Sequence, residues 1–244
     1  CMALAQLGRA VVRRGRVAEG LALLDEAMTV ALSGESGDPL ACGDACCTTL
    51  VVCDELADLR RAAEWCEAVV AFTERRRFTP VQAWCRGIYG GVLVRAGDWE
   101  RAEAVLEEAL RRPAGGRGRR AHPVALAALA ELRLRQGRIE EAARLLEGLD
   151  DAPAALRPLV GLRIALGDLA LARALVERHA ERADPAAAAA LRGSVALAAG
   201  EPADAEAAAA ELSAMAASLR RDDLAAEAAL LAGRAAVARG DAGS

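Results

Sequence analysis

The sequence predicts an all-α fold, a right-handed superhelical solenoid of about six divergent helix–turn–helix repeats. Hydrophobic residues make up 54% of the 244 residues and aromatic residues only 2%, so Ala and Leu must supply most of the core. Ile, which favours strands, occurs only three times. A unit of one glycine and one small residue also recurs along the chain at about the length of a helical hairpin. Together these observations predict stacked helices.

Each unit has a glycine at its turn and, in most copies, Ala five positions later. Successive turns are separated by 42, 40, 40, 30, 33 and 40 residues. A degenerate copy from Ala57 to Ala62 lies between the first two, and the first copy has Gly20 in place of the usual Ala. The residues that define the units are Gly8, Gly15, Ala27, Gly90, Gly97, Ala102, Ala109, Gly137, Ala142, Gly167, Ala172, Gly200 and Ala205.

Apolar residues with helical spacing stand on both sides of each turn. Ile88 and Val92 share a face before Gly97, and Leu106 lies on the apolar face that follows it. The glycine ends the first helix in a left-handed conformation, and an Asp after it can cap the second helix. Helices are therefore predicted at residues 2–14, 17–32, 40–55, 59–76, 80–96, 99–112, 122–136, 139–148, 153–166, 169–180, 185–199, 203–218 and 222–239.

This pattern resembles the tetratricopeptide repeat over nearly the whole chain. The first copy matches best, with Leu7 and Gly8 in the first helix, Gly15 at the turn and Ala27 in the second helix. The resemblance implies that Trp99, directly after its turn, packs between repeat helices. Other copies depart from the pattern, with Ala130, Val160 and Gly193 at or near the small site of the first helix.

The chain is predicted to form one solenoid with three parts. Residues 1–112 carry the first repeats, residues 113–121 form a flexible linker rich in Gly and Arg, and residues 122–244 carry Ala-rich repeats. Because each repeat packs only on its neighbours, the linker need not separate independent domains.

The charge distribution excludes a strongly basic nucleic-acid binder. The chain has 31 basic and 35 acidic residues, a net charge of −4, although residues 111–138 contain eight Arg and one Glu. No aromatic residue accompanies this basic stretch, so a solvated linker is favoured over a nucleic-acid contact.

We expect no membrane span and no secretory signal, and the odd number of cysteines favours reduced thiols in a cytoplasmic protein.

Three cysteines offer candidate metal or redox chemistry. Cys42, Cys46 and Cys53 lie within about 40° of one another on a helix, and Cys66 or Cys85 could face them from neighbouring helices. Packing of small thiols between close helices is the favoured interpretation.

Catalytic residues are not indicated. His122 and His179 are predicted to be surface or capping residues, and adjacent carboxylates such as Glu107 and Glu108 point apart on a helix. The sequence has no nucleophile elbow, phosphate-binding loop or dinucleotide fingerprint. We therefore expect no enzyme activity and no cofactor.

Every aromatic residue lies between residues 65 and 99. Core packing is the default role for such residues, but large amphipathic rings can also anchor a bound peptide or small ligand. The candidates for such a binding surface are Trp65, Phe72, Trp84 and Tyr89.

A more specific resemblance rests on three runs: Gly15 to Met28, Asp58 to Trp65, and Gly97 to Ala102. They are similar to the helical-repeat region of large LuxR-type transcriptional regulators of the actinobacterial kind. In that family the region precedes a DNA-binding helix-turn-helix and can follow an ATPase module, neither of which is present here. The resemblance implies a segment cut from a longer regulator.

We accordingly expect a non-catalytic sensor or coupling region that binds a protein, a peptide or a small effector in a concave groove. DNA would be bound only through a helix-turn-helix absent from this chain. A stand-alone scaffold or adaptor protein is the alternative, and a thiol-based metal or redox sensor is a third possibility. An uncovered solenoid end could also pair two copies into a homodimer.

Overall fold

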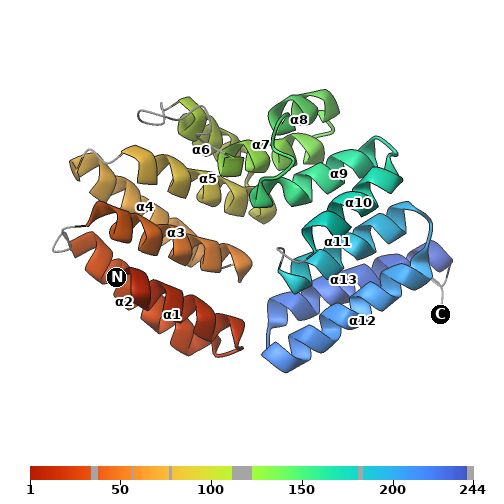
Figure 1. Cartoon of the computed structure of the whole chain (residues 1–244), viewed down its shortest axis with the longest axis horizontal. Helices are drawn as coiled ribbons and strands as arrows, with labels where there is room; N and C mark the ends of the chain where they lie inside the picture. Colours follow the sequence, from red (N-terminus) through yellow and green to blue (C-terminus); the bar gives the residue numbers. More distant parts are fainter. Residues whose placement is uncertain (34–37, 57, 77–78, 112–122, 181–183, 241–244) are drawn as a thin grey trace. The chain divides into compact units, whose positions relative to one another are not determined.

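The fold is all-α. A computed structural model describes residues 1–33, 38–56, 58–76, 79–111, 123–180 and 184–240, and within these ranges it has thirteen α-helices, one short 3-10 helix and no strand. The helices follow one another as hairpins along the chain (Figure 1), which confirms the predicted solenoid of helix–turn–helix repeats. None of the helices in these ranges is long and apolar enough to cross a membrane.

The helices have the following bounds: α1 (Met2–Arg13), α2 (Val17–Ser33), α3 (Pro39–Glu55), α4 (Leu59–Arg76), α5 (Thr79–Ala96), α6 (Trp99–Arg111), α7 (Pro123–Arg135), α8 (Ile139–Leu146), η1 (Pro153–Ala155), α9 (Leu156–Ala165), α10 (Leu169–His179), α11 (Pro185–Ala198), α12 (Pro202–Leu219) and α13 (Asp222–Arg239).

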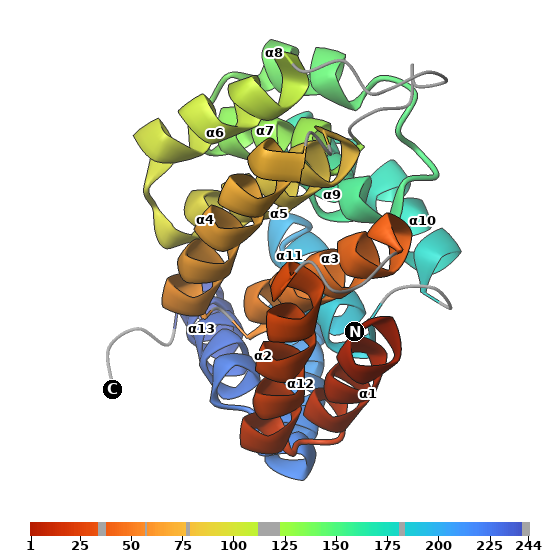
Figure 2. The same ribbon diagram turned by 90° about the vertical axis from the view of Figure 1, so that its left-hand side faces the viewer.

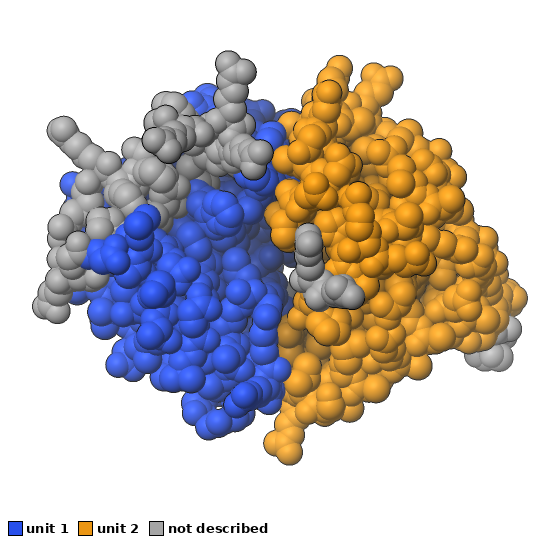
Figure 3. All heavy atoms as spheres, in the orientation of Figure 1, with its two compact units in different colours: residues 1–133 blue, residues 134–244 orange. Residues whose placement is uncertain are grey.

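The chain forms two compact units, residues 1–133 and residues 134–244, which Figure 3 distinguishes by colour. The division lies inside α7, whereas the predicted linker at residues 113–121 lies outside the described residues. Each unit is described below by itself.

The first unit consists of hairpins that pack in chain order. α1 pairs with α2, α3 with α4, and α5 with α6, and each first helix also contacts the first helix of the next hairpin. α2 additionally contacts both α3 and α4, and Figure 2 shows α2 and α4 passing along one side of this unit. Every hairpin is therefore held by its neighbours as well as by its own partner helix.

The second unit repeats this arrangement with smaller side chains. α9 packs on α10, α11 on α12, and α13 on both α11 and α12. One core cluster of this unit is formed mostly by alanines, with Leu212, Leu224 and Leu231 as the buried large residues among them.

Left-handed glycines end the first helices, as predicted. Gly15, Gly97, Gly137, Gly167 and Gly200 all have φ between 73° and 82°, where an L side chain is strained. Asp58, Asp98 and Asp168 then cap the following helices, since each carboxylate accepts from a backbone N–H three residues later. The degenerate turn residue Ala57 lies outside the described residues. Gly148, with φ of 74°, is also left-handed and was not predicted.

Small residues allow the paired helices to approach closely. Ala27, Ala62, Ala102, Ala109, Ala142, Ala172 and Ala205 are all 0% exposed. Seven positions before their turn glycines, Gly8, Gly90 and Gly193 have no room for a side chain. A Cβ at Gly90 would lie 2.4 Å from Leu106, and a Cβ at Gly193 would lie 2.3 Å from Leu231. The small residues that recur in each repeat are thus the positions where helices contact each other.

We predict opposite effects for two adjacent glycines in α5. Gly90→Ala should destabilise the chain by about 1–3 kcal/mol, because its Cβ collides with Leu106. Gly91→Ala should be neutral or stabilising by up to about 1 kcal/mol, because its Cβ would meet only Ala128, at 3.6 Å, and Ala favours helix. Urea unfolding of both variants measures the difference, and equal effects would refute the close-contact explanation.

Candidate partner-binding grooves

One groove in the first unit crosses three successive helices. It has a volume of about 250 Å³, and we call it the Tyr89 groove. α4 and α6, the second helices of consecutive hairpins, flank it, and α5 lies between them. The lining residues are Cys66, Glu67, Val70, Ala71, Glu74, Arg86, Tyr89 and Val105.

Charge and apolar surface meet in the Tyr89 groove. The Arg86 side chain is only 14% exposed and forms ion pairs with Glu108 at 3.3 Å and Glu74 at 3.8 Å. The Tyr89 hydroxyl accepts a hydrogen bond of 3.0 Å from Arg101. Burial raises the pKa of Tyr89 above its usual value, against the opposing effect of Arg101.

A second groove occupies an equivalent place in the second unit. It lies between the second helices α10 and α12 with α11 between them, has a volume of about 430 Å³, and is called here the Arg173 groove. Arg173 pairs with Glu201 and Arg192 with Glu211. The lining residues are Arg173, Val176, Glu177, Arg192, Val195, Ala196, Glu201, Asp204, Ala207, Ala208 and Glu211.

The two grooves share repeat positions. Tyr89 and Arg192 both stand eight residues before their turn glycines, Gly97 and Gly200. Glu108 and Glu211 both stand eleven residues after them, and each accepts from an arginine of the preceding helix. Neither Arg86 nor any residue of the Arg173 groove was predicted as a site residue. This recurring Glu was the signal that could have found them.

Tyr89 is one of the four predicted aromatic anchors and lines the Tyr89 groove, whereas the other three lie outside the linings of these two grooves. Trp84, on α5, is 42% exposed, and Phe72, on α4, is half-buried. Trp99, which the repeat resemblance placed between helices, is 39% exposed at the start of α6. A partner-binding role for these aromatic residues stays a prediction.

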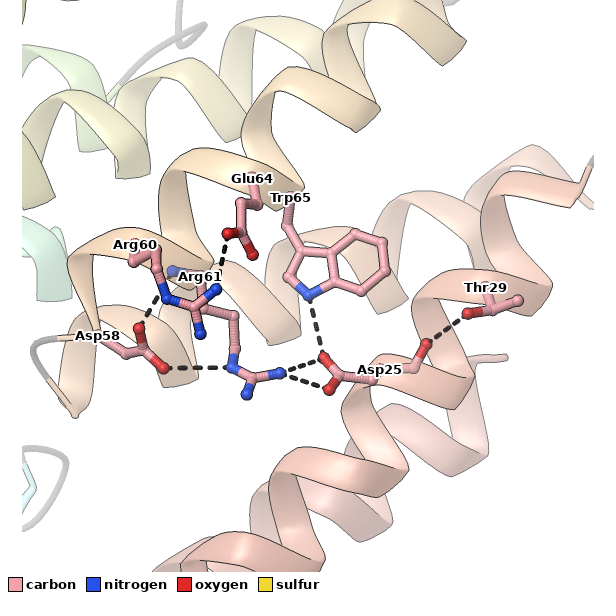
Figure 4. A network of polar contacts seen from close by, with 7 residues as sticks. All are labelled: Asp25, Thr29, Asp58, Arg60, Arg61, Glu64 and Trp65. Carbon is pink, nitrogen blue, oxygen red and sulfur yellow. Dashed lines mark hydrogen bonds and ion pairs between the residues drawn. The ribbon is translucent and has the colours of Figure 1, made fainter.

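Trp65 instead belongs to a polar network between α2 and α4 (Figure 4). Its indole N–H donates to Asp25 at 3.1 Å, and Asp25 also accepts from Arg61, which is held from its other side by Asp58 at 3.2 Å. The hydrogen bond to Asp25 is the main cause that raises the pKa of Arg61. The network joins the first hairpin to the second, so the indole of Trp65 is held in place by a structural contact.

The cysteine stripe lies in the core, as the packing interpretation predicted. Cys42, Cys46 and Cys53 are at most 5% exposed, and all seven cysteines are free thiols. Burial raises the pKa of Cys46, Cys53 and Cys66 to about 12. Among the described residues no group of three or more His, Cys, Asp or Glu side chains could hold a metal ion.

The prediction that His179 is a surface or capping residue was wrong. His179 is 5% exposed, and its Nε2 lies 3.1 Å from the carbonyl oxygen of Asp150. It stands twelve residues after Gly167, the repeat position of the buried Ala27 and Ala109, which explains its burial. His122 lies outside the described residues.

The two grooves are lined by similar kinds of side chains. Their linings combine apolar side chains with arginine–carboxylate pairs and include no histidine, serine or threonine. Such surfaces can bind a partner through shape and charge.

Comparisons with known proteins agree with this fold. Residues 93–154 match the tetratricopeptide repeat family, and this segment includes the turns at Gly97 and Gly137. The structure is similar to the crystal structure of a tetratricopeptide repeat protein from Parabacteroides merdae ATCC 43184, with a TM-score of 0.55, 18% sequence identity, and coverage of 95% of this chain and 82% of that chain. No curated protein matches the sequence. The chain therefore has the tetratricopeptide-repeat fold.

We predict that the buried thiols react slowly in the folded chain. Raising a thiol pKa from 9.0 to about 12 reduces the thiolate fraction at pH 8 about a thousandfold, and burial blocks access as well. A thiol-reactive dye should label the partly exposed Cys1 and Cys47 first and the buried thiols only in denaturant. Folding stability should also fall as pH rises from 9 toward 12, because the unfolded thiols ionise first. Rapid labelling of Cys46 or Cys53 would revive the redox interpretation.

We also predict that Asp25 supports the contact between the first two hairpins. Asp25→Ala should destabilise the chain by about 1–2 kcal/mol, since it removes the acceptor of both Trp65 and Arg61. The matched control is Glu64→Ala, which breaks only the exposed Arg60–Glu64 pair and should cost less than about 0.5 kcal/mol. Urea unfolding distinguishes the two, and a cost for Asp25→Ala no larger than the control would contradict the assignment.

Proposed function

We propose that this chain is a non-catalytic helical-repeat scaffold that binds a segment of a protein partner in the Tyr89 groove. The observation that carries the proposal is the composition of that groove, with Val70, Ala71 and Val105 beside the ion-paired Arg86. Its volume of about 250 Å³ is below the range of about 300–1,000 Å³ that encloses drug-sized ligands. One or two anchoring side chains of a partner fit it better than a whole small molecule.

We further propose that the scaffold acts in a bacterial LuxR-type transcription regulator, as the segment that couples partner binding to a DNA-binding output. Support for this context is the similarity of the runs Gly15 to Met28, Asp58 to Trp65, and Gly97 to Ala102. A partner bound in a groove between second helices would change the spacing of consecutive hairpins. That change would alter the position of the repeat that an output domain would contact. The free thiols suit a reducing cytoplasm.

A stand-alone scaffold or adaptor is the second candidate, favoured by the tetratricopeptide-repeat fold itself. The native coding sequence around this segment decides between the two, because a regulator must encode a helix-turn-helix downstream. A homodimer through α13, whose Leu230 and Val237 are 57% and 64% exposed, stays a prediction.

Blocking the Tyr89 groove tests partner binding. Peptides of twelve residues would be selected on the purified chain from a random displayed library, and their affinities measured by fluorescence anisotropy. Ala71→Trp should weaken binding at least about tenfold, because Ala71 is exposed and lines the groove. Ala104→Trp, at an exposed position outside the groove, should leave binding unchanged. Failure to select any peptide, or equal effects of the two variants, would overturn the proposal.

A further inference from the structure

The Arg173 groove differs from the Tyr89 groove in size and in charge. Its volume of about 430 Å³ is large enough to hold several side chains of a bound segment. Val176, Val195 and Ala208 form an apolar floor contributed by three helices, and charged residues form its rims. A partner must therefore present apolar and charged groups together.

The charges of the Arg173 groove favour a cation. Both arginines of its lining already hold a carboxylate, Arg173 through Glu201 and Arg192 through Glu211. The lining contains four carboxylates against these two arginines, which leaves a local charge of −2. An anionic partner would have to displace a paired carboxylate from an arginine. A cationic partner would instead be attracted by the negative charge that the ion pairs do not neutralise.

Glu177 and Asp204 are the carboxylates left over. Within the described residues neither side chain forms an ion pair closer than 4.0 Å, and both act on Arg173 only through longer-range attraction. Arg178, the nearest guanidinium in sequence to Glu177, donates instead to the carbonyl oxygen of Asp150. Glu177 also lies in the last turn of α10, where the helix dipole disfavours an anion. A cationic group beside it would relieve that unfavourable placement.

The apolar floor argues for a peptide segment over a small polyamine. A polyamine could satisfy the two carboxylates, but it would leave the exposed apolar surface of the groove, which includes Ala207, uncovered. An amphipathic segment with basic side chains beside small aliphatic ones covers both the rims and the floor.

We propose that the Arg173 groove is a second partner site, which binds a protein segment carrying basic side chains next to aliphatic ones. This inference rests on the proposed scaffold function and adds the chemistry of a partner. Arg192 takes the place that Tyr89 has in the other groove, so the two grooves select different segments.

Three labelled peptides test the proposal on the full chain. Each is an acetylated and amidated twelve-residue sequence of Leu and Ala with three variable positions, occupied by Arg, by Gln or by Glu. The Arg peptide should bind at least about tenfold more tightly than the Gln peptide at low ionic strength, and the Glu peptide should bind more weakly still. Hydrogen exchange should show protection in α10, α11 and α12. Equal binding of the Arg and Gln peptides would overturn the proposal.

Two pairs of variants place the site. Glu177→Gln with Asp204→Asn should weaken the Arg peptide about five- to tenfold, whereas Glu140→Gln with Asp151→Asn, the same charge change at exposed positions outside the groove, should not. Ala207→Trp should block the groove, and Ala210→Trp, exposed on the same helix outside it, should not. Equal losses within either pair would show that binding is non-specific.

The remaining outcomes separate this inference from the scaffold proposal. Spermidine that displaces the Arg peptide at equal concentration would identify a small-cation site and overturn the peptide assignment. If library peptides respond to Ala71→Trp while the Arg peptide does not bind, only the second site fails. If neither binds, the scaffold function fails with it.

Discussion

The close approach of paired helices is the constraint on which the rest of the structure depends. It is possible only because glycine or alanine stands where the helices meet, and at Gly8 an added Cβ would lie 2.9 Å from the carbonyl oxygen of Gly20. At five of the turns a left-handed glycine brings the second helix back along the first. A hairpin so compact has little core of its own, so its stability comes from its neighbours.

Polar contacts between hairpins add specificity to this packing. Asp25 holds both Trp65 and Arg61, and the 5% exposed Arg133 of α7 pairs with Glu103 of α6 at 2.5 Å. A partly buried arginine that is separated from its carboxylate loses more free energy than an alkyl group that is shifted within the core. Such pairs therefore disfavour a shifted register of one hairpin on the next. The aliphatic core makes the hairpins adhere, and the ion pairs define how they align.

The fold could be predicted from the sequence because its signals are local. All but one of the repeat turns carry a glycine, and the helices carry apolar faces. The predicted helix ends therefore fall within a few residues of the observed ones. The grooves could not, because each combines side chains from two successive repeats, as the pair of Arg173 and Glu201 does. Helical periodicity identifies the buried face of one helix but not which exposed residues face the next second helix. The prediction for His179 was wrong for a related reason. Its place at a helix end suggested an exposed residue, although it occupies a repeat position that is buried.

The shared position of Tyr89 and Arg192 has an evolutionary consequence. Tyr89 contributes a neutral ring to its groove and Arg192 a charged group to the other. The glycine that follows each of them, Gly90 or Gly193, has no room for a side chain because a leucine of a packed helix lies against it. Recognition and architecture are thus assigned to adjacent residues of one helix. A duplicated hairpin can acquire a new binding preference by one substitution while inheriting its scaffold intact, so an array of this kind can diversify without refolding.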